Sequence, residues 1–482
     1  MNKKIDCLLV AFSGIEQSSA QEHIDKEGCD VKLRPFFNGA IAYLGSYLNA
    51  RSLNFDYVCS CEEQIETLEN KLLQDIGIIA ISTTFVLDVE RIISLIKWIR
   101  VKKPHCRIVI GGSFITYTIS QYSIVEREIL MRGIGAEYFI CSYFGEKALA
   151  ELVAAIKKND FEKIAHIPNL YRREGNHYLF FCQEDDSTRL QENMVDWTLF
   201  SDDTATYIPV RTGISCMYNC AYCSFPQYGG KYQVLDIPSI EKELQTLVNV
   251  KKVEIVHFVD DCFNKPANRF KNVLRMLVRN QFTFKWHSFL RCEDIDDETI
   301  SLMKESGCLG VLIGLESGCP DMLSRMNKKI DLIKSKETIH KLNEAGILTY
   351  ALFMVGYPGE TIQSVKRTID YIEECRPMYY ALSPWYCNIS SPVYQHKNEY
   401  EICGKNYEWK HKTMDFEMAR DLCLDIFYTV KNSTMMSINY TYVFQLLYNQ
   451  VPFERIKRII DYGNQKLIRD NEFSQRRKGY IQ

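Results

Sequence analysis

The sequence predicts an α/β protein that begins with a doubly wound parallel sheet, continues into six strand–helix repeats and ends in a small helical region. Short strands that are apolar along both faces alternate with amphipathic helices, which is typical of parallel sheets covered on both sides. The 482 residues are also too many for a single hydrophobic core. We expect a first α/β domain over residues 1–165, a linker over 166–205, a second α/β domain over 206–395 and a helical cap over 396–482, closing the mouth of the second domain.

The first domain is predicted to contain four strands, at residues 7–12, 76–82, 106–110 and 138–141. Phe37, Ile41, Leu44 and Leu48 follow the spacing of one helical face. Asp88 is placed to cap a second helix, which buries Ile92, Ile93, Ile96 and Ile99. Ligands of doubly wound sheets lie beyond the carboxyl ends of the strands. A ligand site is therefore expected at Thr83, Thr84, Phe85, Gly111, Gly112, Ser113, Gly145 and Glu146.

The second domain is predicted to contain six strands, each separated from the next by a helical pattern. They lie at residues 207–212, 253–259, 284–290, 310–315, 349–355 and 380–385. Six parallel repeats are expected to form a partial barrel, whose reactive side chains come from the carboxyl ends of its strands. Asp260 and Asp261 follow the second strand, Arg291 the third, and Glu316 and Ser317 the fourth. Arg291 has the geometry to bind a carboxylate with two parallel hydrogen bonds.

Three cysteines lie just after the first strand of this domain, with the spacing C-x3-C-x2-C: Cys216, Cys220 and Cys223. Thiols this close can each hold one iron of a cuboidal iron–sulfur cluster. No fourth cysteine follows before Cys262, so one iron would stay open to a ligand. A zinc knuckle and three unrelated core cysteines are the alternatives. Zinc needs a fourth Cys or His at knuckle spacing, and the nearest downstream histidine, His257, lies far outside it.

With Tyr222 directly before the last cysteine, this loop resembles the signature of the radical S-adenosylmethionine (SAM) superfamily. A Rossmann-like domain in front of it makes the whole chain similar to the cobalamin-dependent (class B) radical SAM methyltransferases. Within that group the phosphinate P-methyltransferases look closest, on the segments 193–197, 225–233, 286–287 and 315–317. The resemblance implies a cobalamin-binding first domain and a radical SAM barrel of the (β/α)6 type.

The resemblance also implies the cofactors and their residues. Cys216, Cys220 and Cys223 would hold a 4Fe-4S cluster, and the eight strand-end residues of the first domain would bind cobalamin (methylcobalamin). S-adenosyl-L-methionine would be bound by Tyr222, Asp260, Asp261, Arg291, Glu316 and Ser317. No catalytic residue is assigned. The D-x-H-x-x-G motif that supplies a cobalt-ligating histidine in other cobalamin proteins is absent, so the lower face of the cobalt would lack that ligand.

The implied reaction is the methylation of an unactivated carbon or a phosphinate phosphorus, in a small molecule or peptide of natural-product biosynthesis. The electron would come from a flavodoxin- or ferredoxin-type donor, and we expect a monomer. The net charge of −3 gives no reason to expect nucleic acid or an anionic membrane as partner. No apolar run approaches the ~20 residues of a membrane span. We expect no signal peptide and a cytoplasmic protein with reduced thiols, 18 in all.

Three other functions remain open from the sequence. A cobalamin-dependent radical SAM enzyme could instead catalyse cyclisation or ring contraction without methyl transfer. A methylthiotransferase would need a second cluster on amino-terminal cysteines and a basic RNA-binding module, whereas Cys7, Cys29, Cys59 and Cys61 are scattered and their surroundings are not basic. A non-enzymatic cobalamin carrier would have no use for the three cysteines of the second domain.

Overall fold

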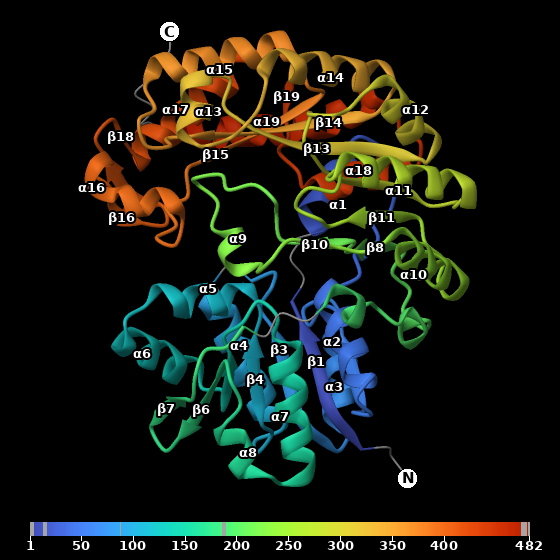
Figure 1. Cartoon of the computed structure of the whole chain (residues 1–482), viewed down its shortest axis with the longest axis vertical. Helices are drawn as coiled ribbons and strands as arrows, with labels where there is room; N and C mark the ends of the chain where they lie inside the picture. Colours follow the sequence, from blue (N-terminus) through green and yellow to red (C-terminus); the bar gives the residue numbers. More distant parts are fainter. Residues whose placement is uncertain (1–3, 13–16, 87, 186–188, 474–479, 481–482) are drawn as a thin grey trace. The chain divides into compact units, whose positions relative to one another are not determined.

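The computed structural model describes residues 4–12, 17–86, 88–185, 189–473 and 480 (Figure 1). The chain divides into two compact units. The first comprises Met1–Glu16, Phe36–Ile208 and Lys242–Lys252, and the second Gln17–Pro35, Pro209–Glu241 and Val253–Gln482. A seven-stranded sheet lies at the centre of each unit.

The sheet of the first unit has the strand order β2-β1-β3-β4-β5-β6-β7. Its first five strands are parallel: β1 (Ile5–Ala11), β2 (Phe55–Val58), β3 (Ile76–Ser82), β4 (Ile108–Gly111) and β5 (Tyr138–Ile140). All seven residues of β1 are buried, as expected for a central parallel strand. The order reverses between β1 and β3, which confirms the doubly wound arrangement. An antiparallel hairpin, β6 (Leu170–Glu174) and β7 (His177–Phe180), extends the sheet.

Helices cover this sheet (Figure 1). They are α2 (Gly39–Asn49), α3 (Ile65–Leu72), α4 (Val89–Lys102), α5 (Ser113–Gln121), α6 (Ile124–Ile134), α7 (Glu146–Lys158) and α8 (Phe161–Ala165). Asp88 caps α4 as predicted, because its carboxylate accepts a hydrogen bond from the Arg91 amide at 2.9 Å. The predicted inner face of α4 is confirmed: Ile92, Ile96 and Ile99 are buried and Ile93 packs against the core.

The sheet of the second unit has the order β19-β15-β14-β13-β12-β11-β8. Its strands are β8 (Tyr207–Val210), β11 (Ile255–Phe258), β12 (Lys285–Leu290), β13 (Cys308–Glu316), β14 (Leu348–Val355), β15 (Tyr379–Pro384) and β19 (Thr434–Met435). The pairings from β11 through β15 to β19 are parallel. The six predicted strands are therefore confirmed, and β8 and β19 form the two edges of an open sheet.

The second unit also contains the loop hairpin β9 (Gly213–Ile214) and β10 (Gln233–Val234). Its helices include α1 (Gln17–Lys26), α9 (Phe225–Tyr228), α11 (Ala267–Asn280), α12 (Asp297–Glu305), α13 (Pro320–Arg325), α14 (Leu332–Glu344) and α15 (Ile362–Cys375), and α10 (Ile237–Val250) runs across the boundary between the units. None of the described helices of either unit combines the length and the apolar content of a membrane span.

The carboxyl-terminal region is not purely helical. It holds α16 (Lys397–Tyr400), α17 (Phe416–Thr429), α18 (Tyr440–Tyr448) and α19 (Phe453–Phe473). It also holds a small antiparallel sheet of β16 (Cys403–Lys405), β17 (Glu408–His411) and β18 (Met414–Asp415). In α18, the Phe444 ring stacks on His287 at 4.0 Å and lies over Gly310, in the amino-terminal half of the main sheet. Because its aromatic rings need apolar surface, α18 lies on the face of the sheet rather than over the strand ends.

Candidate active site

The cysteine loop is clamped at its base by buried polar contacts. Strands β9 and β10 pair antiparallel at the two ends of the loop. Asp260, at the end of β11, accepts hydrogen bonds from the amide of Thr212, at 2.6 Å, and from its hydroxyl, at 2.5 Å. Arg269 donates to the Thr212 carbonyl at 2.9 Å. These contacts fix the direction in which the chain leaves β8, and with it the position of the three cysteines.

Cys216, Cys220 and Cys223 are free thiols, the second buried and the others half-buried. Burial, together with the charges of the neighbouring Cys220 and Cys216, raises the pKa of Cys223 to about 11. Among the described residues, no group of three or more His, Cys, Asp or Glu side chains is arranged to hold a single metal ion. A cuboidal cluster does not need such convergence, because each thiolate binds a different iron. The zinc alternative therefore lacks a ligand set in the described part of the chain.

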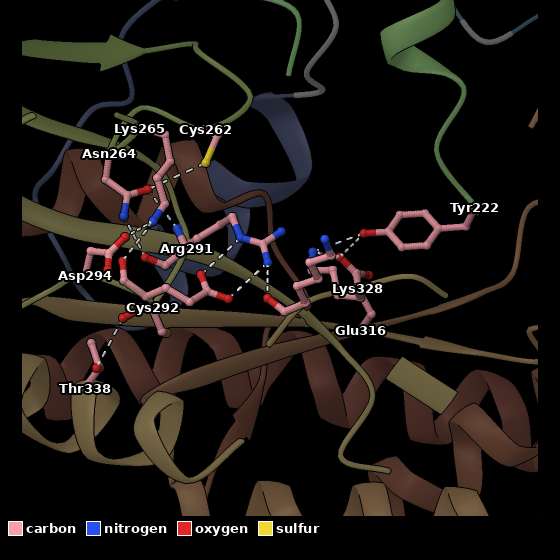
Figure 2. Close-up of polar contacts among 12 residues, drawn as sticks. Tyr222, Cys262, Asn264, Lys265, Arg291, Cys292, Asp294, Glu316, Lys328 and Thr338 are labelled. Atoms are coloured by element: carbon pink, nitrogen blue, oxygen red, sulfur yellow. Dashed lines mark hydrogen bonds and ion pairs between the residues drawn. The ribbon is translucent and has the colours of Figure 1, made fainter. Parts of the chain in front are cut away.

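Tyr222, Glu316 and Lys328 form a polar triad beside this loop, in which Lys328 is buried and the other two residues are half-buried (Figure 2). Oε1 of Glu316 accepts from the Tyr222 hydroxyl at 2.9 Å and from Nζ of Lys328 at 3.1 Å. Nζ of Lys328 also lies 3.1 Å from the Tyr222 hydroxyl. Burial, followed by the charge of Glu316, raises the pKa of Tyr222 well above its ordinary value. Tyr222 therefore stays a neutral hydrogen-bond donor.

The backbone of β13 explains how Glu316 reaches the triad. The register with β14 shifts between Gly314 and Glu316, and Glu316 has a φ of 68° in the left-handed region. A bulge of this kind re-aims a side chain at the end of a strand. Such a φ costs energy for a residue other than glycine and persists where surrounding contacts hold it. Here the two hydrogen bonds to Oε1 hold it.

Arg291 is occupied by groups of the protein itself (Figure 2). Its guanidinium binds both carboxylate oxygens of Glu293, at 3.0 and 3.1 Å, and lies 3.9 Å above the ring centre of Tyr218 in the cysteine loop. Asn264 locks the backbone of Arg291 in place, donating to its carbonyl at 2.7 Å and accepting from its amide at 3.0 Å. The ends of β11 and β12 are thereby tied together under the loop.

The remaining residues predicted to contact SAM divide into two kinds. Ser317 is fully buried and engaged, because its hydroxyl contacts that of Thr368 at 3.2 Å and accepts from the Cys319 amide at 3.1 Å. Asp261 keeps access to solvent. Desolvation and then the charge of Asp260 raise the pKa of Asp261 to about 7. Its charge in turn raises the pKa of Cys216 and Cys223, which places it beside the cysteine loop.

The predicted ligand edge of the first unit is built from the turns after β3 and β4. The Thr83 hydroxyl donates to the Gly111 carbonyl at 2.8 Å, and the Ser113 hydroxyl donates to the Thr84 carbonyl at 3.3 Å. Gly112 has a φ of 105°, and a Cβ there would lie 2.8 Å from the amide nitrogen of Thr83. Glycine is therefore required for the two turns to approach each other. Phe85 is exposed at this edge.

After β5, the same edge contains a buried pair of polar side chains. Gly145 precedes α7, and Glu146 is its first residue. Oε1 of Glu146 accepts from the Asn193 amide at 2.8 Å, and both side chains are more than nine-tenths buried. The second oxygen of Glu146 and the side-chain oxygen of Asn193 have no hydrogen-bond partner among the described residues.

Residues 210–372, from the end of β8 into α15, match the family model of the radical SAM superfamily. The chain contains a radical SAM domain. Its fold is similar to that of TsrM from Kitasatospora setae, a radical S-adenosylmethionine methyltransferase. The TM-score is 0.62 at 19% identity, over 82% of this chain and 74% of TsrM. The predicted fold class and the resemblance to this group of enzymes are confirmed, while the phosphinate subgroup stays a prediction.

Two curated relatives match with low identity. An uncharacterized methyltransferase of Pyrococcus horikoshii is 23% identical over 274 residues, which are 55% of this chain and 58% of the relative. The anaerobic magnesium-protoporphyrin IX monomethyl ester cyclase of Rubrivivax gelatinosus is 23% identical over 361 residues, which are 70% of this chain and 62% of the cyclase. The chain thus spans less than two thirds of either relative.

Within the radical SAM domain, the structure brings Tyr222, Asp261 and Glu316 around the cysteine loop. Asp260, Arg291 and Ser317 are hydrogen-bonded to other groups of the protein, and their contacts with SAM stay predictions. Sequence reasoning missed Lys328. In the sequence it is one of two adjacent lysines after a short helix, which looks like an ordinary solvated turn. The fold buries it against Glu316, so only a search for cationic partners of the predicted carboxylate would have found it.

Proposed function

We propose that this chain is a cobalamin-dependent radical SAM methyltransferase acting on an unactivated carbon or a phosphinate phosphorus of a small molecule or peptide. The observation that carries the proposal is the cysteine loop, held at the strand ends of an open parallel sheet within a radical SAM domain. The fold of the chain adds support, because TsrM, which it resembles, was solved with cobalamin and a [4Fe-4S] cluster bound.

The residues present fit an iron–sulfur cluster. Three neighbouring free thiols, Cys216, Cys220 and Cys223, would each hold one iron and leave the fourth open to SAM. Cys262, the next cysteine in the sequence, lies in contact with the Asn264 side chain at 3.7 Å. A bound cluster supplies the single electron that reductive cleavage of SAM requires. The protein contributes the loop that orients the three thiols and the buried surroundings that exclude water.

The triad gives SAM a place to bind beside the open iron. SAM carries an ammonium, a carboxylate and ribose hydroxyls. The ammonium of Lys328 is suited to the carboxylate. Glu316 is suited to the ammonium or to the hydroxyls, since both of its hydrogen bonds to described residues go to Oε1. Tyr222 holds Glu316 in position. Asp261, whose charge acts on Cys216, is a second carboxylate suited to the ammonium.

The first unit offers features that suit cobalamin. Its predicted residues gather at the carboxyl edge of one parallel sheet, where Gly112 lets the backbone approach closely. The partnerless oxygens of Glu146 and Asn193 are acceptors at the same edge, and the carboxamide groups around a corrin ring are hydrogen-bond donors. Bound cobalamin supplies the methyl group. Thr83, Thr84, Phe85, Gly111, Ser113 and Gly145 complete the proposed contact set.

Cyclisation or ring contraction without methyl transfer is the second candidate function. It is favoured by the match to the magnesium-protoporphyrin ester cyclase, which extends over 70% of this chain. The two functions share the cysteine loop and the triad, so they differ only in what happens to the substrate.

Mass spectrometry of the products separates these functions. Anaerobic protein would be incubated with methyl-labelled SAM, cobalamin, a reductant and candidate phosphinate or peptide substrates. Methyl transfer predicts a product heavier by one labelled methyl group, together with 5′-deoxyadenosine. An unlabelled product formed alongside 5′-deoxyadenosine would instead support the cyclase function.

A further inference from the structure

A groove of about 470 Å³ lies on the second unit and is lined only by residues between Pro320 and Ile333. These residues belong to α13, to the start of α14 and to the turn between them. No strand residue lines the groove. Lys328 of the triad is part of the lining, so the groove adjoins the strand ends where SAM is proposed to bind.

The segment that contains this groove is hydrogen-bonded directly to the cysteine loop. The Ala221 amide donates to the Met326 carbonyl at 2.7 Å. The Asn327 side chain donates to the Asn219 carbonyl, also at 2.7 Å. These two contacts bracket Cys220 and reach within two residues of Cys223. Lys328, which lines the groove, adds the contact to the Tyr222 hydroxyl.

The groove has an apolar centre and a basic surround. Ile333 is 68% exposed, although it lines the groove with Leu323 and Ile330. Arg325, Lys329 and Lys334 are exposed, and none of them pairs with a carboxylate among the described residues. The one acidic residue in the lining, Asp331, is turned to the amides of Ile333 and Lys334, at 3.0 and 3.1 Å. The same two helices also carry the exposed carboxylates Asp321 and Glu337, and Asp321 is paired with Arg367 at 3.3 Å, so the surround keeps a net positive charge.

We propose that this groove is the docking site of a negatively charged one-electron carrier protein. The charge of the surround selects an acidic partner, and the apolar centre gives the contact a dehydrated core. One electron passes from the reduced carrier to the cluster held by Cys216, Cys220 and Cys223, and no atoms are exchanged. The proposal rests on the proposed function, since it requires a reducible cluster.

Binding of a purified bacterial flavodoxin, an acidic carrier, tests the groove without relying on turnover. Lys329→Glu reverses a charge at the groove, and Ile333→Ser removes its exposed apolar contact. Lys304→Glu is the matched control, because Lys304 is an exposed lysine on α12, outside the groove, and has no ion pair in the described chain. The dissociation constant would be measured at low and high salt on cluster-loaded protein.

Lys329→Glu is expected to weaken flavodoxin binding by about three- to tenfold at low salt, and less at high salt. Bleaching of the cluster absorbance by reduced flavodoxin should slow in parallel, while reduction by dithionite stays at the wild-type rate. Ile333→Ser should weaken binding at both salt concentrations. Unchanged binding in both groove variants, or an equal loss in Lys304→Glu, would overturn the proposal. A wild-type protein that dithionite cannot reduce would instead count against the proposed function.

Discussion

Replacing Glu316 by glutamine tests the triad most sharply, because glutamine keeps the shape of the side chain and removes its charge. In the native protein, Oε1 of Glu316 accepts two hydrogen bonds, one of them from an ammonium. The side chains of Lys328 and Glu316 are only 7% and 14% exposed, so water replaces little of the lost interaction. Glu316→Gln therefore leaves the Lys328 ammonium buried without a counter-charge.

The expected cost follows from these contacts. Converting charge-assisted hydrogen bonds into neutral ones lowers the free energy of unfolding by about 1 kcal/mol for each bond, and the buried ammonium adds to this. A total of about 2–3 kcal/mol corresponds to a fall of about 4–12 °C in the melting temperature of a domain of this size. Lys328→Met should also destabilise the domain. The double variant should lose about 1–2 kcal/mol less than the sum, because neither charge remains unpaired.

The assay is anaerobic thermal unfolding, followed by titration of the cluster-loaded protein with SAM. Glu316→Gln should lower the affinity for SAM by about ten- to a hundredfold, with unchanged iron content. Glu344→Gln, the same change at the exposed end of α14, is the control and should alter neither quantity. The reasoning would be refuted if Glu316→Gln matched this control in both melting temperature and SAM affinity, or if the effects of the double variant were additive.

Three further changes test separate parts of the account. Burial raises the pKa of Glu360 from 4.5 to about 8. The folded protein therefore keeps a proton that the unfolded chain releases, so this group's contribution to stability declines as the pH rises from about 4.5 to 8. Between about pH 6 and 9, the wild type should therefore lose about 2–3 kcal/mol more of its free energy of unfolding than Glu360→Gln, and its melting temperature should fall further. Melting temperatures that change in parallel for the two proteins would contradict this. Gly112→Ala should cost about 2–4 kcal/mol in thermal unfolding, because its Cβ meets the Thr83 backbone at positive φ. Gly133→Ala, a helical glycine with no atom within 4 Å of the added Cβ, should be neutral or stabilising. Asn264→Ala should cost about 2–4 kcal/mol in the same assay, since two buried backbone groups of Arg291 lose their partner. A loss below about 0.5 kcal/mol would show that water replaces the amide.

The fold was largely predictable because its strands are buried on both faces. Continuous apolar runs such as residues 76–82 and 349–355, with amphipathic helices on either side, indicate strands that are covered on both faces. The predicted strand ends agree with the observed ones to within a few residues. The carboxyl-terminal sheet β16–β18 was missed because its strands have only two to four residues, too short for an alternating pattern to emerge.

The candidate site was less predictable, because strand-end position alone does not show which partner a side chain takes. The SAM contacts of Arg291, Asp260 and Ser317 stay predictions, but the sequence did not show that each side chain has a partner within the protein: Glu293, Thr212 and Thr368. The bulge that re-aims Glu316 depends on the register with β14, which no local pattern encodes. Lys328 reaches the triad only through the path of the chain after α13.

The measurement that tests the central claim most directly is the formation of 5′-deoxyadenosine from SAM. The wild-type protein and a variant with Cys216, Cys220 and Cys223 all replaced by alanine would be reconstituted anaerobically with iron and sulfide and reduced with dithionite. The account predicts about four irons and 5′-deoxyadenosine for the wild type, and neither for the variant. Production of 5′-deoxyadenosine by the triple variant, or none from a wild-type protein that carries its full iron content, would contradict it.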